Sequence, residues 1–342
     1  MTKILIIGAG AMGSAFTVPC VENKHEVVLV GTHLEDNTID QMMKNDYLHP
    51  TLKCKLSKKL RLSKFKSFSE ELKKKPDLIV IAVSSKGIDW AGKEISKYYK
   101  NKCSIVLLTK GLSIENNKII TLSDKIKNKL EKNGHKSIDI SAIKGPCLAS
   151  GLANKMRTGT VVANKDIKKA EYIKSIISTE YYSTEVSNDT IGVEICGAIK
   201  NIYSMLIGAS QGLSNPLATT EIQSKFFLNT AASLIHRSIS EMVNFVTYFG
   251  GKTETVYGLA GLADLYVSAI GGRNSEMGKY LGQGYSYKEA KEKFMNDITV
   301  EGADLAFEIG SNILKNFKSS EYPLMFNILE TICLNKKLEI NW

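Results

Sequence analysis

The sequence lacks the features that would place it in a membrane, a secretory pathway or a disulfide-stabilised class. No run reaches the roughly 18 apolar residues that a bilayer-spanning helix needs. The apolar stretch at the amino terminus ends in a glycine-rich turn rather than a small-residue cleavage site, which argues against a signal peptide. The six cysteines are scattered and form no C-x-x-C pair, a pattern typical of reduced thiols. We therefore expect a cytoplasmic protein without a membrane span.

The sequence also lacks the aromatic ladder that would accompany a nucleic-acid-binding surface. The formal net charge is +10, and much of the excess lies between Lys58 and Lys75, with glutamates interspersed. Nucleic-acid bases stack on aromatic side chains, and no such series accompanies these lysines. We interpret them as a solvated surface whose positive field helps to attract phosphorylated substrates, and we expect no nucleic-acid partner.

No internal repeat and no low-complexity linker divides the chain, although 342 residues are many for one hydrophobic core. Strands and helices alternate over residues 1–187, whereas helical periodicity dominates residues 188–342. This pattern predicts an α/β domain with a doubly wound sheet, followed by an all-α domain. The first helix of the second half carries an apolar stripe of Ile191, Ile195, Ala198, Ile199, Ile202 and Leu206. We expect the two domains to abut directly, with the ligand site between them.

A glycine motif near the amino terminus predicts a nucleotide-binding turn. The expected strand Lys3–Ile7 runs straight into residues 8–13, GAGAMG, spaced G-x-G-x-x-G, and an apolar helical stretch follows. Gly8 allows a sharp turn, Gly10 allows close approach of a pyrophosphate, and Gly13 allows the helix to pack tightly on the strand. Free N–H groups at the start of the helix face the phosphate. The strand before the motif and the helix after it favour dinucleotide binding over a merely structural turn.

The residue that normally pairs with the cofactor ribose is missing from its usual position. The second expected strand, Glu26–Val30, is followed by Gly31, Thr32 and His33. An acidic residue there would indicate NAD and an arginine would indicate NADP. Glu35 and Asp36 lie slightly too far along the chain to decide the matter. The choice between NAD and NADP therefore stays open at this point.

Small, polar or cationic residues follow three successive strands. Further strands are expected at residues 78–83, 104–109, 139–143, 160–163 and 181–186. Ser84 and Ser85 follow the first of these, Lys110 and Gly111 the second, and Gly145-Pro146-Cys147 the third. The carboxyl ends of parallel strands line the ligand crevice of an open sheet. Each segment by itself could be an ordinary turn, but the three together favour one shared site.

The helical half contains three candidates for chemistry. Lys200 lies in the stretch 197–201, which is otherwise small and uncharged, so we expect a partly desolvated cleft rather than a solvent face. Asp264 either caps the next helix or holds an ammonium group in position. Gly271-Gly272-Arg273-Asn274 is either a polar loop or an anion site in which the guanidinium binds a phosphate.

These residues together resemble the NAD(P)-dependent glycerol-3-phosphate dehydrogenases, which reduce dihydroxyacetone phosphate to sn-glycerol 3-phosphate. The resemblance extends from Gly8 to about Leu338. The matching stretches are GAGAMG (8–13), LLTKGL (107–112), KGPCLA (144–149), IGVEICGAIKN (191–201), GLAGLADL (258–265), GGRN (271–274) and VEG (300–302). The resemblance implies a Rossmann-type domain, NAD or NADP as cofactor, a small phosphorylated substrate, a homodimer in the cytoplasm, and a place in glycerophospholipid and carbohydrate metabolism.

The resemblance also implies a role for individual residues, without a metal. Lys200 is implied as the catalytic acid/base, with Lys110 in contact with substrate and cofactor and Asp264 organising the catalytic ammonium. The other implied substrate contacts are Gly145, Cys147, Asn201, Ser268, Arg273 and Asn274. The implied cofactor contacts are Gly8, Gly10, Ala11, Met12, Gly13, Thr32, His33, Ser84, Lys110, Ala149, Arg273 and Glu301. Cys147 stands where the family commonly has serine or threonine, so a hydroxyl donor is missing there.

Two other interpretations compete with this one. A 3-hydroxyacid dehydrogenase also places a lysine on the first helix after its nucleotide domain, but it lacks the phosphate-binding pattern of Lys110-Gly111 and residues 272–274. A non-catalytic nicotinamide sensor would bind NADH without consuming it. The presence of both Lys200 and Asp264 favours an enzyme.

Overall fold

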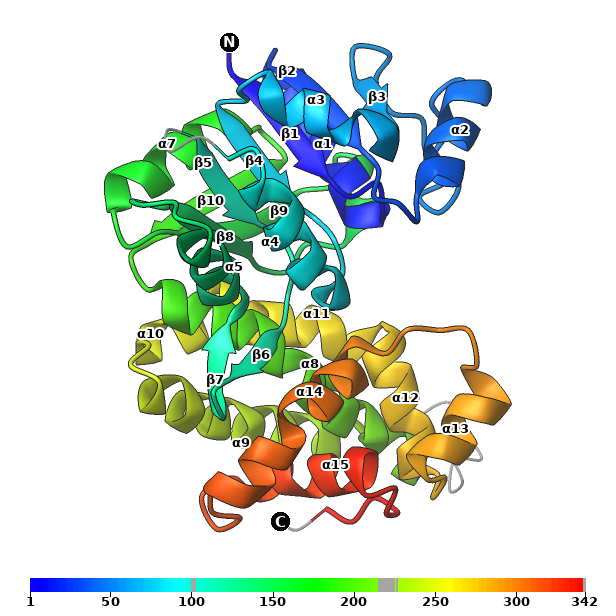
Figure 1. Ribbon diagram of the computed structural model, residues 1–342. Coiled ribbons are helices and arrows are strands. Elements are labelled where there is room, and N and C mark those ends of the chain that lie inside the picture. The colour runs from blue at the N-terminus through cyan, green and yellow to red at the C-terminus, as the bar shows by residue number, and fades with distance from the viewer. Residues whose placement is uncertain (100–102, 215–224, 226, 341–342) are drawn as a thin grey trace. The chain divides into compact units, whose positions relative to one another are not determined.

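The computed structural model describes residues 1–99, 103–214, 225 and 227–340 (Figure 1). Contacts between residues divide the chain into two compact units. The first unit comprises Met1–Lys110 and Thr121–Thr190, and the second comprises Gly111–Ile120 and Ile191–Trp342. The sequence analysis assigned residues 111–120 to the first domain, whereas their contacts group them with the second unit.

The first unit is built on an eight-stranded sheet with the strand order β10-β9-β8-β5-β4-β1-β2-β3. Neighbouring strands are parallel except for the antiparallel pair β8 and β9. Because the order reverses at β1, the sheet is doubly wound, as predicted. The strands are β1 (Lys3–Ile7), β2 (Glu26–Val30), β3 (Arg61–Ser63), β4 (Leu78–Ile81), β5 (Ser104–Leu107), β8 (Ile140–Lys144), β9 (Thr158–Ala163) and β10 (Tyr182–Ser187).

Helices cover both faces of this sheet, which explains why its central strands β1, β2 and β4 are nearly continuous apolar runs. Alternate residues of β1 enter different cores: Ile4 and Ile6 pack in one hydrophobic cluster, and Leu5 and Ile7 in the other. The first cluster includes side chains of α1, α2 and α7, and the second includes side chains of α3, α4 and α5. The helices are α1 (Ala11–Glu22), α2 (Asp36–Lys44), α3 (Phe68–Lys73), α4 (Ile88–Ser96), α5 (Leu122–Lys132), α6 (Ala149–Ala153) and α7 (Ile167–Ile177).

The second unit is helical and is organised around the long helix α8 (Thr190–Ser214). By length and composition α8 could cross a membrane, but 94% of its most apolar window is buried, as in a core helix. The other α-helices among the described residues of this unit are α9 (Phe227–Tyr248), α10 (Thr253–Tyr257), α11 (Asp264–Ile270), α12 (Arg273–Gly282), α13 (Tyr287–Phe294), α14 (Glu301–Asn316) and α15 (Pro323–Cys333). A π-helical turn, Leu259–Ala263, leads into α11.

A hairpin that the sequence analysis did not anticipate packs on this helical unit. It consists of β6 (Leu112–Glu115) and β7 (Lys118–Thr121). Ser113 donates a hydrogen bond to Glu308 Oε1 at 2.6 Å, and Asn312 on α14 donates one to the carbonyl of Asn117 at 2.8 Å. These two contacts join segments about 195 residues apart, and sequence patterns carry no information on such pairings.

Glycines allow α8 and α12 to approach backbone to backbone. A Cβ atom on Gly278 would lie 1.9 Å from the carbonyl oxygen of Met205, and one on Gly208 would lie 2.3 Å from that of Ser275. No larger residue fits at either position without moving a helix. This close approach fixes the first turn of α12, which carries Arg273 and Asn274, against the side of α8.

Candidate active and cofactor-binding sites

Lys200 is a buried lysine held by two side chains of α11. Its side chain lies on α8, and the residue is only 5% exposed. Its ammonium donates a hydrogen bond to Asp264 Oδ1 at 2.8 Å and another to the hydroxyl of Ser268. Asp264 and Ser268 are four residues apart, so they project from one face of the helix. The alternative of a solvent-exposed surface lysine is therefore wrong.

Asp264 is not the cap of the following helix, which was the alternative to its pairing with an ammonium group. The cap position of α11 is Ala263, and Asp264 is the first residue inside the helix. The π-helical turn before it packs closely, because a Cβ atom on Gly261 would lie 2.0 Å from the carbonyl oxygen of Val256. The carboxylate is 2% exposed, and a buried charge is stable only when it is paired, as it is here with Lys200.

A second hydrogen-bonded group of side chains includes Asn201, the residue that follows Lys200 on α8. Asn274 donates to Asn201 Oδ1 at 3.0 Å and accepts the N–H of Gly302 at 2.8 Å. Asn201 in turn donates to Glu301 Oε2 at 3.5 Å. The second unit therefore holds seven of the predicted residues in two hydrogen-bonded groups, which adjoin along α8 at Lys200 and Asn201. The first group is Lys200, Asp264 and Ser268, and the second is Asn201, Arg273, Asn274 and Glu301.

Arg273 stands at the exposed edge of this group. Its guanidinium donates to Glu301 Oε1 at 3.0 Å, and both side chains are about half exposed, at 52% and 50%. An ion pair in such contact with water contributes little to stability. A phosphate can therefore replace the Glu301 carboxylate at the guanidinium, because an arginine binds phosphate through two parallel hydrogen bonds.

The glycine loop of the first unit has the geometry that a pyrophosphate needs. A Cβ atom on Gly13 would lie 2.1 Å from the carbonyl oxygen of Gly8, and Gly8 itself has a φ of +110°. Gly10 is open by comparison, because the nearest atom to a Cβ there would be Glu35 Oε1 at 3.6 Å. Helix α1 begins at Ala11, so the N–H groups of its first turn lack intrahelical acceptors. These residues fit a dinucleotide whose pyrophosphate contacts Gly10, Ala11 and Met12.

Glu35 reaches this loop, although the sequence analysis placed it too far along the chain. Its Oε2 accepts the N–H of Ala9 at 3.0 Å and the N–H of Thr32 at 2.8 Å. The chain turns back after β2, with the N–H of Glu35 bonded to the carbonyl of Thr32 at 3.0 Å. This tight turn makes linear distance from the glycines a poor guide to which residue reaches the loop, and the composition of the turn gives no signal of it.

His49, which was not predicted from the sequence, bonds to the carbonyl of Ala9, whereas Glu35 bonds to the N–H of the same residue. Its Nδ1 accepts the N–H groups of Thr51 and Leu52, both at 3.1 Å. The ring proton therefore sits on Nε2, which donates to the carbonyl of Ala9 at 3.1 Å. The imidazole is 1% exposed, and burial lowers its pKa below the usual value of 6.5.

The buried imidazole predicts a dependence of stability on pH. A histidine with a lowered pKa in the folded state binds fewer protons when folded than when unfolded, so stability rises with pH through its titration range. We expect the urea midpoint to fall as the pH is lowered from about 7.5 to about 5.5. In His49→Gln, which keeps an N–H donor but does not titrate, this fall becomes shallower. An unchanged slope in the variant would show that His49 contributes nothing to it.

The strand-end residues of the first unit are only partly brought together. Lys110 donates to the carbonyl of Gly145 at 3.4 Å, because β5 and β8 are neighbours in the sheet. Gly145 has a φ of +142° and lies against Thr160, so its backbone conformation requires glycine. His33 packs on the rings of Phe65 and Trp90 at centroid distances of 5.9 and 5.4 Å. Of the other predicted residues, Ser84 precedes a 3₁₀ turn, Cys147 is partly buried, and Ala149 begins α6.

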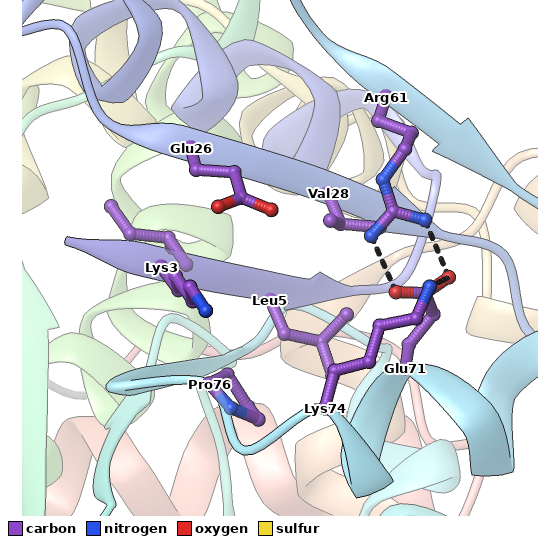
Figure 2. Close-up of a pocket in the computed structure, with 9 residues that line it drawn as sticks. Lys3, Leu5, Glu26, Val28, Arg61, Glu71, Lys74 and Pro76 are labelled. Atoms are coloured by element: carbon purple, nitrogen blue, oxygen red, sulfur yellow. Dashed lines mark hydrogen bonds and ion pairs between the residues drawn. The ribbon is translucent and has the colours of Figure 1, made fainter. Parts of the chain in front are cut away.

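A pocket of about 230 Å³ in the first unit lies away from the glycine loop (Figure 2). Lys3 and Glu26, which line it, stand at the amino ends of β1 and β2, whereas the loop follows the carboxyl end of β1. Figure 2 shows Arg61 facing Glu71. The two terminal guanidinium nitrogens donate to the two carboxylate oxygens, each at 2.5 Å. The hydrogen bonds from Arg61 lower the pKa of Glu71. This pocket therefore contains a satisfied ion pair and is not the predicted cofactor site.

A doubly wound sheet with a glycine-loop turn, together with a helical unit that holds a buried lysine against a carboxylate, defines a two-domain pyridine-nucleotide-dependent dehydrogenase. The chain belongs to the NAD-dependent glycerol-3-phosphate dehydrogenase family. The model of the family's amino-terminal domain matches residues 3–170, and the model of its carboxy-terminal domain matches residues 189–340. The protein is an NAD(P)-dependent oxidoreductase, which confirms the family resemblance, the fold class and the cofactor class predicted from the sequence.

Individual relatives match the chain along nearly its whole length. It is 33% identical over 337 residues to the NADP(+)-dependent glycerol-3-phosphate dehydrogenase of Archaeoglobus fulgidus, covering 96% of each chain. It is 30% identical over 342 residues to the glycerol-3-phosphate dehydrogenase [NAD(P)+] of Mesoplasma florum, covering 97% of this chain and 96% of the relative. The crystal structure of glycerol-3-phosphate dehydrogenase from Coxiella burnetii aligns with a TM-score of 0.81 at 25% identity, covering 98% and 96% of the two chains.

Proposed function

We propose that the protein reduces dihydroxyacetone phosphate to sn-glycerol 3-phosphate, with Lys200 as the general acid/base. The observation that carries this proposal is the buried ammonium of Lys200, held at 2.8 Å by Asp264 and also bonded to Ser268. The nicotinamide, when bound, supplies the hydride to the carbonyl carbon. Lys200 donates a proton to the oxygen of that carbonyl and takes it back in the oxidation direction.

Asp264 and Ser268 act by holding the ammonium of Lys200. The ammonium donates one hydrogen bond to the carboxylate of Asp264 and one to the hydroxyl of Ser268, and these two contacts orient it on α8. The carboxylate also favours the charged form of the lysine. The buried ammonium then stabilises the negative charge that develops on the substrate oxygen, and does so without reorganisation of water.

Asn201, Arg273 and Asn274 are proposed to bind the rest of the substrate. Arg273 gives up its ion pair with the exposed Glu301 carboxylate and binds the substrate phosphate instead. The amides of Asn201 and Asn274, which are bonded to each other at 3.0 Å, offer hydrogen bonds to the substrate hydroxyl or phosphate oxygens. Glu301 is then free to contact the cofactor, as the family resemblance implies.

The first unit is proposed to contribute the cofactor contacts and three substrate contacts. Gly8, Gly10, Ala11, Met12 and Gly13 form the pyrophosphate turn, which the clearance above Gly10 supports. The other cofactor contacts proposed in the first unit are Thr32, His33, Ser84, Lys110 and Ala149, and its proposed substrate contacts are Lys110, Gly145 and Cys147. Arg273 and Glu301 are the cofactor contacts proposed in the second unit. We also carry forward a homodimer in the cytoplasm, without nucleic-acid or membrane partners. The scattered spacing of the six cysteines in the sequence, without a C-x-x-C pair, supports a reducing compartment.

A substrate panel tests the proposed reaction against its main alternative. Oxidation of NADH and NADPH is followed with dihydroxyacetone phosphate, unphosphorylated dihydroxyacetone and a 3-oxoacid. We expect turnover with the phosphorylated ketone and a loss of at least about 100-fold in kcat/KM without the phosphate. Faster turnover of the 3-oxoacid would favour a hydroxyacid dehydrogenase, and cofactor binding without turnover of any substrate would favour a sensor.

Replacement of Arg273 by alanine should mainly weaken substrate binding. Loss of the charged hydrogen bonds to phosphate predicts an increase of about 10- to 100-fold in KM for dihydroxyacetone phosphate, with a smaller change in kcat. Lys315→Ala, which removes a positive charge from the exposed end of α14, is the matched control and should leave KM unchanged. An unaltered KM in the Arg273 variant contradicts the phosphate-binding role.

A further inference from the structure

The carboxylate of Glu35 lies directly on the loop that the proposed function assigns to the cofactor pyrophosphate. Its Oε2 accepts two backbone N–H groups, from Ala9 at 3.0 Å and from Thr32 at 2.8 Å. Its Oε1 would lie 3.6 Å from a Cβ atom on Gly10. The carboxylate thus bridges the segments that follow β1 and β2, and these strands are parallel neighbours. In a doubly wound sheet the ribose next to the adenine lies at this edge.

The side chain of Glu35 reaches the place where an acidic ribose partner usually lies, although the residue itself is not directly after β2. It is the cap residue of α2, yet its side chain bonds to the glycine loop rather than to its own helix. Two hydrogen bonds from backbone atoms fix the carboxylate in place, so it cannot swing away when a ligand arrives. One oxygen has accepted both of these N–H groups, which leaves Oε1 as an acceptor for a ribose hydroxyl.

The surrounding charges reinforce that of Glu35. Asp36 and Asp40 follow on α2, so three carboxylates stand between residues 35 and 40. Lys64, a cation from the end of β3, is already paired with Asp40 at 2.6 Å. Asp36 accepts the N–H of Phe65 at 2.9 Å, which holds that carboxylate at the same edge of the sheet. A 2′-phosphate at this edge would meet carboxylates, where proteins that bind NADP commonly offer an arginine.

We propose that Glu35 makes this enzyme selective for NADH over NADPH. Its carboxylate accepts a hydrogen bond from the 2′-hydroxyl of the adenosine ribose and repels the 2′-phosphate of NADPH. This proposal rests on dinucleotide binding at the glycine loop, which is part of the proposed function, but not on the identity of the ketone substrate or on the role of Lys200.

Equilibrium binding of the two reduced cofactors tests the proposal without catalysis. Titrations that follow nicotinamide fluorescence should give a Kd for NADH about tenfold or more below that for NADPH in the wild-type protein. Glu35→Gln keeps the shape and removes the charge, so it should reduce this ratio at least about fivefold, mainly by tighter binding of NADPH. Glu35→Asp keeps the charge and should keep the preference for NADH.

A carboxylate elsewhere in the first unit provides the matched control. Glu171→Gln makes the same exchange on α7, where the side chain is 54% exposed, and should change the ratio of the two Kd values by less than about twofold. Equal or tighter binding of NADPH by the wild-type protein would overturn the proposal, and so would a wild-type ratio in a folded Glu35→Gln variant. A preference for NADH together with no turnover of dihydroxyacetone phosphate would contradict the proposed reaction and leave the role of Glu35 supported.

Discussion

Replacing Lys200 by methionine is expected to lower kcat for reduction of dihydroxyacetone phosphate by about 10³-fold. Methionine keeps an unbranched side chain of similar length but removes both the proton donor and the positive charge. The substitution leaves the glycine loop, which is proposed to bind the pyrophosphate, unaltered, so the Kd for NADH should stay within about twofold of wild type. Steady-state rates and a cofactor titration on the same preparation give both quantities.

The variant Lys200→Met removes the lysine that contacts the buried carboxylate of Asp264, so a control is needed that also removes this negative charge. Asp264 is 2% exposed, and an unpaired charge at such a depth is costly. The double variant Lys200→Met, Asp264→Asn removes this charge, so it should recover thermal stability while its kcat stays as low as that of the single variant. A kcat within a few-fold of wild type in either folded variant would show that Lys200 is not the acid/base.

Replacing Gly278 by alanine should destabilise the helical unit by about 3 kcal/mol or more. The added Cβ would lie 1.9 Å from the carbonyl oxygen and 2.7 Å from the carbonyl carbon of Met205. Both belong to the backbone of α8, so one of the two helices must move. Because α12 also carries Arg273 and Asn274, the displacement should raise KM for the substrate as well. Urea unfolding followed by circular dichroism measures the first effect.

Gly271→Ala is the matched control for this substitution. Gly271 has an extended backbone, with φ −159° and ψ 125°, and nothing lies within 4 Å of a Cβ atom there. Alanine at this position should change the free energy of unfolding by less than about 0.5 kcal/mol. If the Gly278 variant is as stable as this control, the close approach of α8 and α12 is not needed for the fold.

Much of the first unit could be predicted from local patterns. The strands of a parallel sheet are short apolar runs buried on both faces, and β1, β2, β4, β5, β8, β9 and β10 all lie at or near their predicted positions. The strand β3 has only three residues, too few for a period to be visible. The hairpin of β6 and β7 was missed because its packing partners lie on α14, far away in sequence.

The candidate catalytic residues could be found because each is a charged residue in a stretch of sequence that is otherwise uncharged. Lys200 is a charge among small apolar residues, and Asp264 is a lone carboxylate in a long uncharged stretch. Burial of either requires a partner, and the structure shows that each is the partner of the other. Their pairing, 64 positions apart, could not be obtained from periodicity.

Glu35 and His49 could not be found in this way because neither breaks a local rule. Glu35 looks like an ordinary acidic residue at the start of a helix, and His49 like a loop residue before a proline. Their importance lies in contacts with Ala9, which is 26 and 40 positions away. Such contacts depend on how the chain turns after β2, and the turn itself has no distinctive composition.

Transfer of deuterium tests the central claim most directly. The enzyme is supplied with dihydroxyacetone phosphate and with NADH deuterated at the transferring position of the nicotinamide, and the product is analysed by mass spectrometry and NMR. We expect sn-glycerol 3-phosphate with one deuterium on its central carbon. Oxidation of the cofactor without a deuterated product, or no oxidation with this ketone while other ketones are reduced, would contradict it.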